Sequence, residues 1–186
     1  MCSSDLLNLA SLTFMVPLGV SAAATVIVGH AVGRDDEGGV RRATVAALVV
    51  GAGFMALMAV LLIGAPELLS RAYTSDPGVL ALAVLLMPIA GVFQVFDGLQ
   101  VVAIGLLRGL GDTRVPMLVN IVGFWCIGMP ASLWLGFGVG YGAVGLWWGL
   151  VAGLVMVATF LLVRVRQQEQ RDLARVVIDD EHHPSA

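Results

Sequence analysis

The stretch that decides the fold is Val115-PMLVNIVGFWCIGMPASLWLGFGVGYGAVGLWWGLVAGLVMVATFLL-Val163, which contains no charged residue. A helix needs about 20 apolar residues to cross a hydrocarbon core about 30 Å thick. The stretch is long enough for two such helices, and a cluster of glycines lies near its middle. We therefore predict two membrane-spanning helices here, over about 115–135 and 141–163.

Three further apolar segments precede this stretch. The first two cover about 6–33 and 43–64, and the third covers about 77–107 with one acid, Asp97, inside it. Two helices would need roughly forty residues with a turn between them. The third segment is therefore predicted to be one helix, tilted or bent to fit the bilayer.

The composition of the chain favours a membrane protein and excludes other classes. Of the 186 residues, 59% are hydrophobic and 12% are charged, whereas a soluble domain is about 25% charged. A net charge of −3 offers no cationic surface for nucleic acid. The two cysteines are far apart and form no disulfide or metal pattern. We expect an all-α polytopic membrane protein with five transmembrane helices within 1–163, a polar tail over 164–186, the lipid bilayer as partner and no cofactor.

The arginines predict the orientation of the bundle, because short cytoplasmic loops retain positive charge. All ten basic residues are arginine, and only Arg71 lies on the opposite side from the rest. This places the N-terminus outside and the C-terminus in the cytoplasm, in the cell's inner membrane. The first residues have no basic start or cleavage site of a signal peptide, so with an N-terminus outside we expect an upstream part of the protein. The alternative is that the first helix inserts by itself in reverse orientation, directed by Arg34, Arg41 and Arg42 behind it.

Asp97 is the strongest functional candidate. Counted from Arg108 at 1.5 Å per residue, it lies roughly 15 Å from the cytoplasmic end, near the bilayer centre. An ionised carboxylate there costs about 2.5 to 3.5 kcal/mol, so it must face the protein interior or water, or be protonated. Such a group can exchange a proton for a cation as its surroundings alternate. The alternative is a structural acid that only links helices through Gln94 or Gln100.

The neighbours of Asp97 suggest a ligand-binding face. Gln94, Asp97 and Gln100 are spaced by three residues, so they form a polar stripe on one helix face. Phe93 and Phe96 lie close to this stripe and could stack on a flat organic cation. Plain packing is the alternative role of the two rings, and it is the commoner one.

Two other acids have competing interpretations. Gly109-Leu-Gly-Asp112 matches the GxGD signature of intramembrane aspartyl proteases, with Asp97 as the second acid. A protease dyad shares one proton, but these acids would be about 22 Å apart in a helix. We favour a turn or N-cap role for Asp112. Asp76 marks the outer mouth of the third helix, either as a cavity acid or as a turn residue before Pro77.

Glycine pairs with four-residue spacing recur along the chain. This spacing lets two helix backbones approach closely, and it is common in membrane proteins. The glycines expected to pack in this way are Gly29, Gly33, Gly105, Gly109, Gly145, Gly149 and Gly153.

Several segments resemble multidrug and toxic compound extrusion (MATE) transporters of the NorM type. The residues that carry the resemblance are Phe14-Met-Val-Pro-Leu-Gly19 and Ala22-Ala-Ala-Thr-Val-Ile-Val-Gly29-His-Ala-Val-Gly33 for the eighth helix, Phe93-Gln-Val-Phe-Asp97-Gly-Leu-Gln-Val-Val-Ala-Ile-Gly105-Leu-Leu-Arg-Gly109 with Asp112-Thr113 for the tenth, and Trp125, Gly128, Pro130 and Gly140-Tyr-Gly-Ala-Val-Gly145-Leu-Trp-Trp-Gly149 for the last two. The likeness extends to about Arg164.

The resemblance implies a two-lobed transporter that exchanges Na⁺ or H⁺ for organic, often cationic, drugs by alternating access. It implies that Asp97 is the cation-coupling acid of the C-terminal lobe, a candidate Na⁺ ligand, and that Asp76 lies near the outer cavity mouth. The five helices would form most of one six-helix lobe, helices eight to twelve. The N-terminal lobe and the helix-seven glutamate that partners Asp97 would then be absent.

Three functions remain open at this stage. The first is part of a cation-coupled multidrug antiporter, which is not an enzyme. The second is a non-transporting membrane subunit or an inert remnant, and the third is the GxGD protease.

Overall fold

The computed structural model describes residues 2–64 and 77–182, with side chains described over 14–64 and 84–170. Every regular element in these ranges is a helix. The elements are α1 (Cys2–Val32), α2 (Glu37–Gly64), α4 (Pro77–Gly109), α5 (Arg114–Val122), η1 (Gly123–Gly128), α6 (Met129–Leu133), η2 (Trp134–Gly138) and α7 (Gly142–His182). Asp76 lies outside the described residues.

Five helical segments are long and apolar enough to cross a membrane. They are Phe14–Val32, Glu37–Gly64, Val84–Gly109, Arg114–Gly138 and Gly142–Gln170. The prediction of an all-α protein with five transmembrane helices is therefore confirmed.

The fourth segment is not a uniform α-helix. Pro130 has no N–H to donate to the preceding turn, and its ring crowds that turn. Two π-helical segments, η1 and η2, lie on either side of the short helix that contains Pro130. Such wide turns absorb a local mismatch in the hydrogen-bond ladder while leaving the helix continuous.

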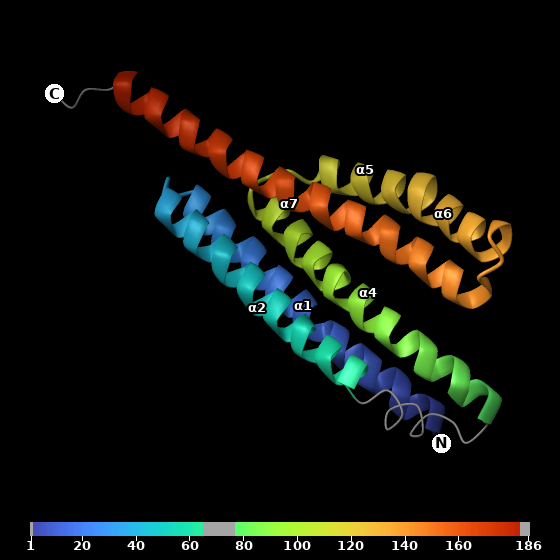
Figure 1. The fold of residues 1–186 in the computed structure, drawn as a ribbon. Coiled ribbons are helices and arrows are strands. Elements are labelled where there is room, and N and C mark those ends of the chain that lie inside the picture. The colour runs from blue at the N-terminus through green and yellow to red at the C-terminus, as the bar shows by residue number, and fades with distance from the viewer. Residues whose placement is uncertain (1, 65–76, 183–186) are drawn as a thin grey trace.

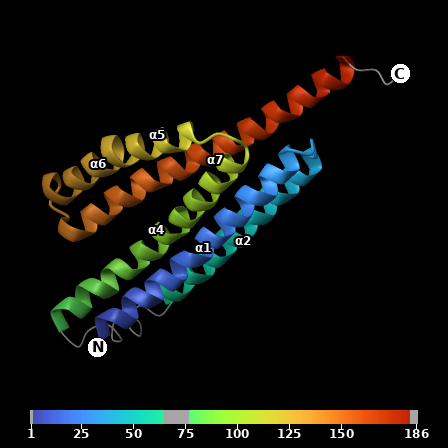
Figure 2. The same cartoon turned by 180° about the vertical axis from the view of Figure 1, so that it is seen from behind.

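Helix α4 lies at the centre of the arrangement. It contacts α1 and α2 on one side and α7 on the other. Figure 1 and Figure 2 show α1, α2 and α4 side by side, while α7 pairs with the chain from α5 to α6. In both views α4 and α7 meet near the C-terminal end of α4 and diverge toward its N-terminal end.

A buried apolar cluster lies where α4 and α7 meet. We call this region the arginine-rich end, because Arg34, Arg108, Arg114 and Arg164 lie there. Small and branched side chains from four helices interlock in this core cluster, which removes apolar surface from contact with solvent and with lipid. Its buried members are Ala24, Val28, Ala31, Val40, Ala47, Val102, Ala103, Leu106, Leu107, Val157, Leu161 and Val165.

The helix boundaries differ from the prediction in one important place. We expected the last helix to end near Val163, but α7 continues to His182. Glutamine, arginine, glutamate and alanine are good helix formers, so loss of hydrophobicity does not by itself end a helix. Val165 is also fully buried in the core cluster, which holds the turn after Val163 against its neighbours.

Candidate functional site

Asp97 lies in the middle of α4 and is half-buried. It follows Phe93 by four residues and precedes Gln100 by three, and these spacings place all three on one side of the helix. Phe93 and Gln100 contact α7 and α5 respectively. On the other side of α4, Gly98 lies against Met55 of α2. Asp97 is therefore on the side of α4 that faces α5 and α7.

An aromatic pair lies one helical turn from Asp97. The rings of Phe93 on α4 and Trp147 on α7 meet edge to face, with their centroids 5.9 Å apart. Such pairs add to the energy gained by burying the rings. The pair joins α4 to α7 on the N-terminal side of Asp97.

Gln100 is tied to a residue that the sequence analysis did not single out. Its Nε2 donates a hydrogen bond to Oδ1 of Asn120 on α5. Asn120 in turn donates from Nδ2 to the carbonyl oxygen of Pro116 at 2.9 Å. Asn120 could have been recognised from the sequence, because it is the one carboxamide side chain within the uncharged stretch from Val115 to Val163.

The remaining members of the predicted ligand-binding face are less engaged. Gln94 and Phe96 are both half-buried, and they flank Asp97 on different sides of the helix. Phe93, Asp97 and Gln100 therefore share one side of α4, with Gln94 and Phe96 at the edges of that side.

Asp112 has a structural environment of its own at the arginine-rich end. Its Oδ1 accepts a hydrogen bond from the backbone N–H of Val115 at 3.3 Å. Its Oδ2 accepts from Nε of Arg164 at 2.9 Å and from Nε2 of Gln168 at 3.1 Å. The continuous helix between Asp97 and Gly109 separates the two acids by roughly 18 Å. Asp97 and Asp112 therefore do not form a protease dyad.

The predicted packing glycines fall into two groups. A methyl group at Gly105 would overlap Ser21, one at Gly145 would meet the carbonyl oxygen of Leu135 at 2.5 Å, and one at Gly149 would overlap the backbone of Ser132. The remaining close contacts are Gly109 with Val28 at 2.9 Å and Gly153 with the Cα of Gly128 at 2.6 Å. A methyl group at Gly29 would make only an ordinary contact, and one at Gly33 would meet only its own helix.

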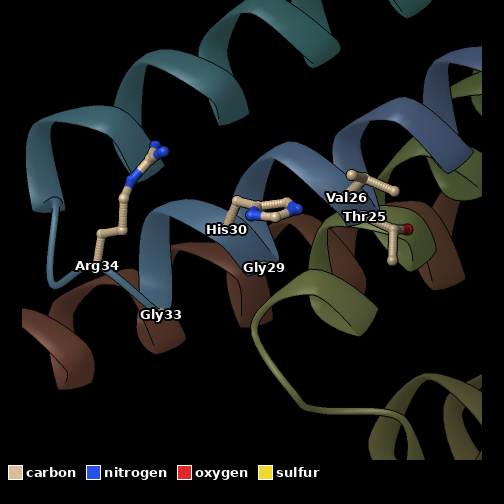
Figure 3. Close-up of a pocket in the computed structure, with 6 residues that line it drawn as sticks. All are labelled: Thr25, Val26, Gly29, His30, Gly33 and Arg34. Carbon is tan, nitrogen blue, oxygen red and sulfur yellow. The ribbon is translucent and has the colours of Figure 1, made fainter.

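Gly29 and Gly33 instead line a shallow pocket on α1. Its volume is about 430 Å³, and its lining consists of Thr25, Val26, Gly29, His30, Gly33 and Arg34. Figure 3 shows the guanidinium group of Arg34 directed toward α2 while the ring of His30 lies along α1. The two side chains do not converge on one point, and the pocket is separate from Asp97.

Comparison with known proteins places the chain in a family. The family model MatE matches residues 5–134, which is more than half of the chain. The chain belongs to the MatE family. This confirms the resemblance drawn from the sequence, and it makes the protein a multi-pass membrane protein of a transporter family.

Curated relatives agree with this placement. This MatE chain is 47% identical over 163 residues to the multidrug resistance protein NorM of Burkholderia vietnamiensis. The match covers 85% of this chain and 35% of that protein. The identity to the probable multidrug resistance protein NorM of Mesorhizobium japonicum is 46% over 163 residues, with the same coverage. The chain thus spans about a third of the length of these relatives.

Solved structures share the fold of this MatE chain. The crystal structure of the eukaryotic MATE transporter AtDTX14 superposes with a TM-score of 0.78 at 24% identity, over 93% of this chain and 40% of that one. An inward-facing multidrug resistance MATE family transporter superposes with a TM-score of 0.79 at 16% identity, over 88% and 38% of the two chains. At these identities the likeness concerns the fold alone.

Proposed function

We propose that this chain is part of a cation-coupled multidrug efflux transporter in which Asp97 binds the coupling ion. The observation that carries the proposal is the position of Asp97 in α4. It is an acid in the middle of a membrane-spanning helix, on the side that faces α5 and α7. Acids in such positions mark ion pathways, because the free-energy cost of a charge at membrane depth is tolerated mainly where the acid has a function.

The chemistry follows from the exchange of one positive species for another. A carboxylate at membrane depth favours a proton, Na⁺ or an organic cation, because each removes the cost of a bare charge. Binding of one species therefore excludes another at the same group. If Asp97 is open to one side of the membrane at a time, this exclusion couples the inward movement of an ion to the outward movement of a drug.

The chain would supply most of one lobe of such a transporter. It spans about a third of its NorM relatives, so we propose that a second, N-terminal lobe completes the cavity. The bundle would lie in the inner membrane with its arginine-rich end in the cytoplasm, because retained positive charge marks that side. This orientation places the N-terminus outside and the C-terminus inside.

The test uses a transport-competent pump that carries this chain's residues. In a chimera, residues 14–170 replace the corresponding segment of NorM of Burkholderia vietnamiensis, and efflux of a fluorescent organic cation is driven by an imposed Na⁺ or H⁺ gradient. Asp97→Asn is expected to abolish gradient-driven efflux while the amount of inserted protein is unchanged. Asp35→Asn, which removes an exposed carboxylate outside the membrane segments, is the matched control and should retain efflux.

The alternative is a non-transporting membrane subunit. In that case Asp97 only links helices. Unchanged efflux in the Asp97→Asn chimera would support this alternative and would remove the central claim.

A further inference from the structure

Gln100 has one polar atom whose role the packing does not explain. The residue is buried, with 7% of its surface exposed. Its Oε1 has no hydrogen-bond donor among the residues that the structure describes. Buried acceptors in folded proteins nearly always have a partner, so an exception calls for a specific explanation.

The direction of this atom is determined by its neighbours. Nδ2 of Asn120 donates to the carbonyl oxygen of Pro116, so Oδ1 of Asn120 faces α4. Only the amide nitrogen of Gln100 can donate to that oxygen. The carbonyl oxygen of Gln100 is therefore directed away from Asn120, and the two amides form a chain that ends in a free acceptor.

Asp97 is the ionisable group placed to share a ligand with this acceptor. The two residues are three apart on α4, so their Cβ atoms lie about 5–6 Å from each other. The helices packed around them offer no competing acid, arginine or histidine at membrane depth, over the described segments 14–29, 43–64, 115–138 and 142–163. Cys126 in the third of these segments is exposed.

We infer that Oε1 of Gln100 is the second oxygen that contacts the ion held by Asp97. When Asp97 is neutral, its hydroxyl donates to Oε1. When a metal cation replaces the proton, the carboxylate and the amide oxygen coordinate it together. Two neighbouring acceptors with no donor between them favour a species that is positive or carries a proton. This inference rests on the proposed function of Asp97 and adds a second ligand to it.

Two variants distinguish a Gln100 that binds the ion from a Gln100 that only links two helices. Gln100→Leu removes both the carbonyl oxygen and the hydrogen bond to Asn120. Asn120→Leu removes the same hydrogen bond and leaves the carbonyl oxygen of Gln100 in place. A merely structural Gln100 predicts equal effects for the two variants, whereas an ion-binding Gln100 predicts a larger effect for its own substitution.

The first readout is infrared absorption of the chain in lipid nanodiscs at low pH, with the spectrum of Asp97→Asn subtracted. Gln100→Leu is expected to move the carboxyl stretch of neutral Asp97 to higher frequency, because its hydroxyl loses an acceptor. Asn120→Leu should leave this band in place. The second readout is binding of radioactive sodium to the chimeric pump, which Gln100→Leu should weaken about tenfold and Asn120→Leu by less than about threefold.

Each outcome of the experiment decides one point. Equal effects of the two variants on the band and on sodium binding would overturn the role of Gln100 and leave that of Asp97 intact. If Asp97→Asn binds sodium as well as the unchanged chimera, both proposals fail. Should Gln100→Leu not insert, Gln100→Met, which keeps the length of the side chain, must show the same loss.

Discussion

Nε of Arg164 on α7 lies 2.9 Å from Oδ2 of Asp112, which belongs to the turn between α4 and α5. Only 9% of the Asp112 side chain and 21% of the Arg164 side chain are exposed. The pair therefore joins three helices at the arginine-rich end through charges that are largely shielded from water. A shielded charge that loses its partner is strongly destabilising, while the intact pair need not be strongly stabilising.

The first prediction concerns this ion pair. Arg164→Ala is expected to lower the free energy of unfolding by about 3 kcal/mol, because it leaves the Asp112 carboxylate without its cation. Thermal unfolding in detergent, followed by circular dichroism, measures the change. Arg166→Ala is the control, since Arg166 is exposed, and it should change stability by less than about 0.5 kcal/mol. Equal losses in both variants would contradict the role of the pair.

The second prediction concerns the contact between α7 and α6. A methyl group at Gly149 would overlap the backbone of Ser132, and backbone cannot move aside as a side chain can. Gly149→Ala is therefore expected to destabilise the protein by about 2 kcal/mol. Gly53→Ala is the matched change, because nothing lies within 4 Å of its added methyl group. That variant should be neutral or slightly more stable, and a loss there as large as at Gly149 would argue against a steric origin.

The third prediction concerns hydrogen bonds between α1 and α4. Oγ of Ser21 donates to the carbonyl oxygen of Val101 at 2.9 Å. Ser21→Ala is expected to cost about 0.6 kcal/mol, the average for such bonds between membrane helices. Thr159→Val removes an exposed hydroxyl that bonds within its own helix, so it should cost less. Unfolding of both variants in mixed detergent gives the comparison, and the reverse order of costs would refute it.

The fourth prediction concerns orientation in the membrane. With the arginine-rich end in the cytoplasm, a green fluorescent protein fused after Ala186 should fluoresce, because this reporter folds there. Alkaline phosphatase fused at the same position should be inactive, because it needs an oxidising compartment for its disulfides. Active phosphatase in a chain that inserts normally would reverse the proposed topology.

Much of the fold could be predicted because it depends on local properties of the chain. The absence of charge from Val115 to Val163 is a property of composition, and a bilayer leaves few alternatives to a helix for such a stretch. The end of α7 could not be predicted in this way. Residues beyond Val163 lose their hydrophobicity but keep high helix propensity, and the burial of Val165 against other helices is not visible in the sequence.

The candidate site shows the same division. Asp97 was identifiable because an acid at membrane depth is unusual in itself. The hydrogen bond between Gln100 and Asn120 was not identifiable, because it depends on which helices become neighbours and on how far they are shifted along their axes relative to each other. Periodicity assigns Gln100 to a face of α4 and says nothing about what that face meets. Arg164 illustrates the point again, since its partner Asp112 lies 52 positions away in the chain.

The position of the core cluster also sets where α4 and α7 can separate. The core cluster joins α1, α2, α4 and α7 close to the arginine-rich end, whereas α4 and α7 separate toward the opposite end (Figure 2). Regions with fewer buried contacts open locally at lower cost. Amide deuteration should therefore advance from the separated ends of α4 and α7 toward Leu106 and Leu161. The two helices would then pivot about the core cluster, which stays closed while the opposite end opens.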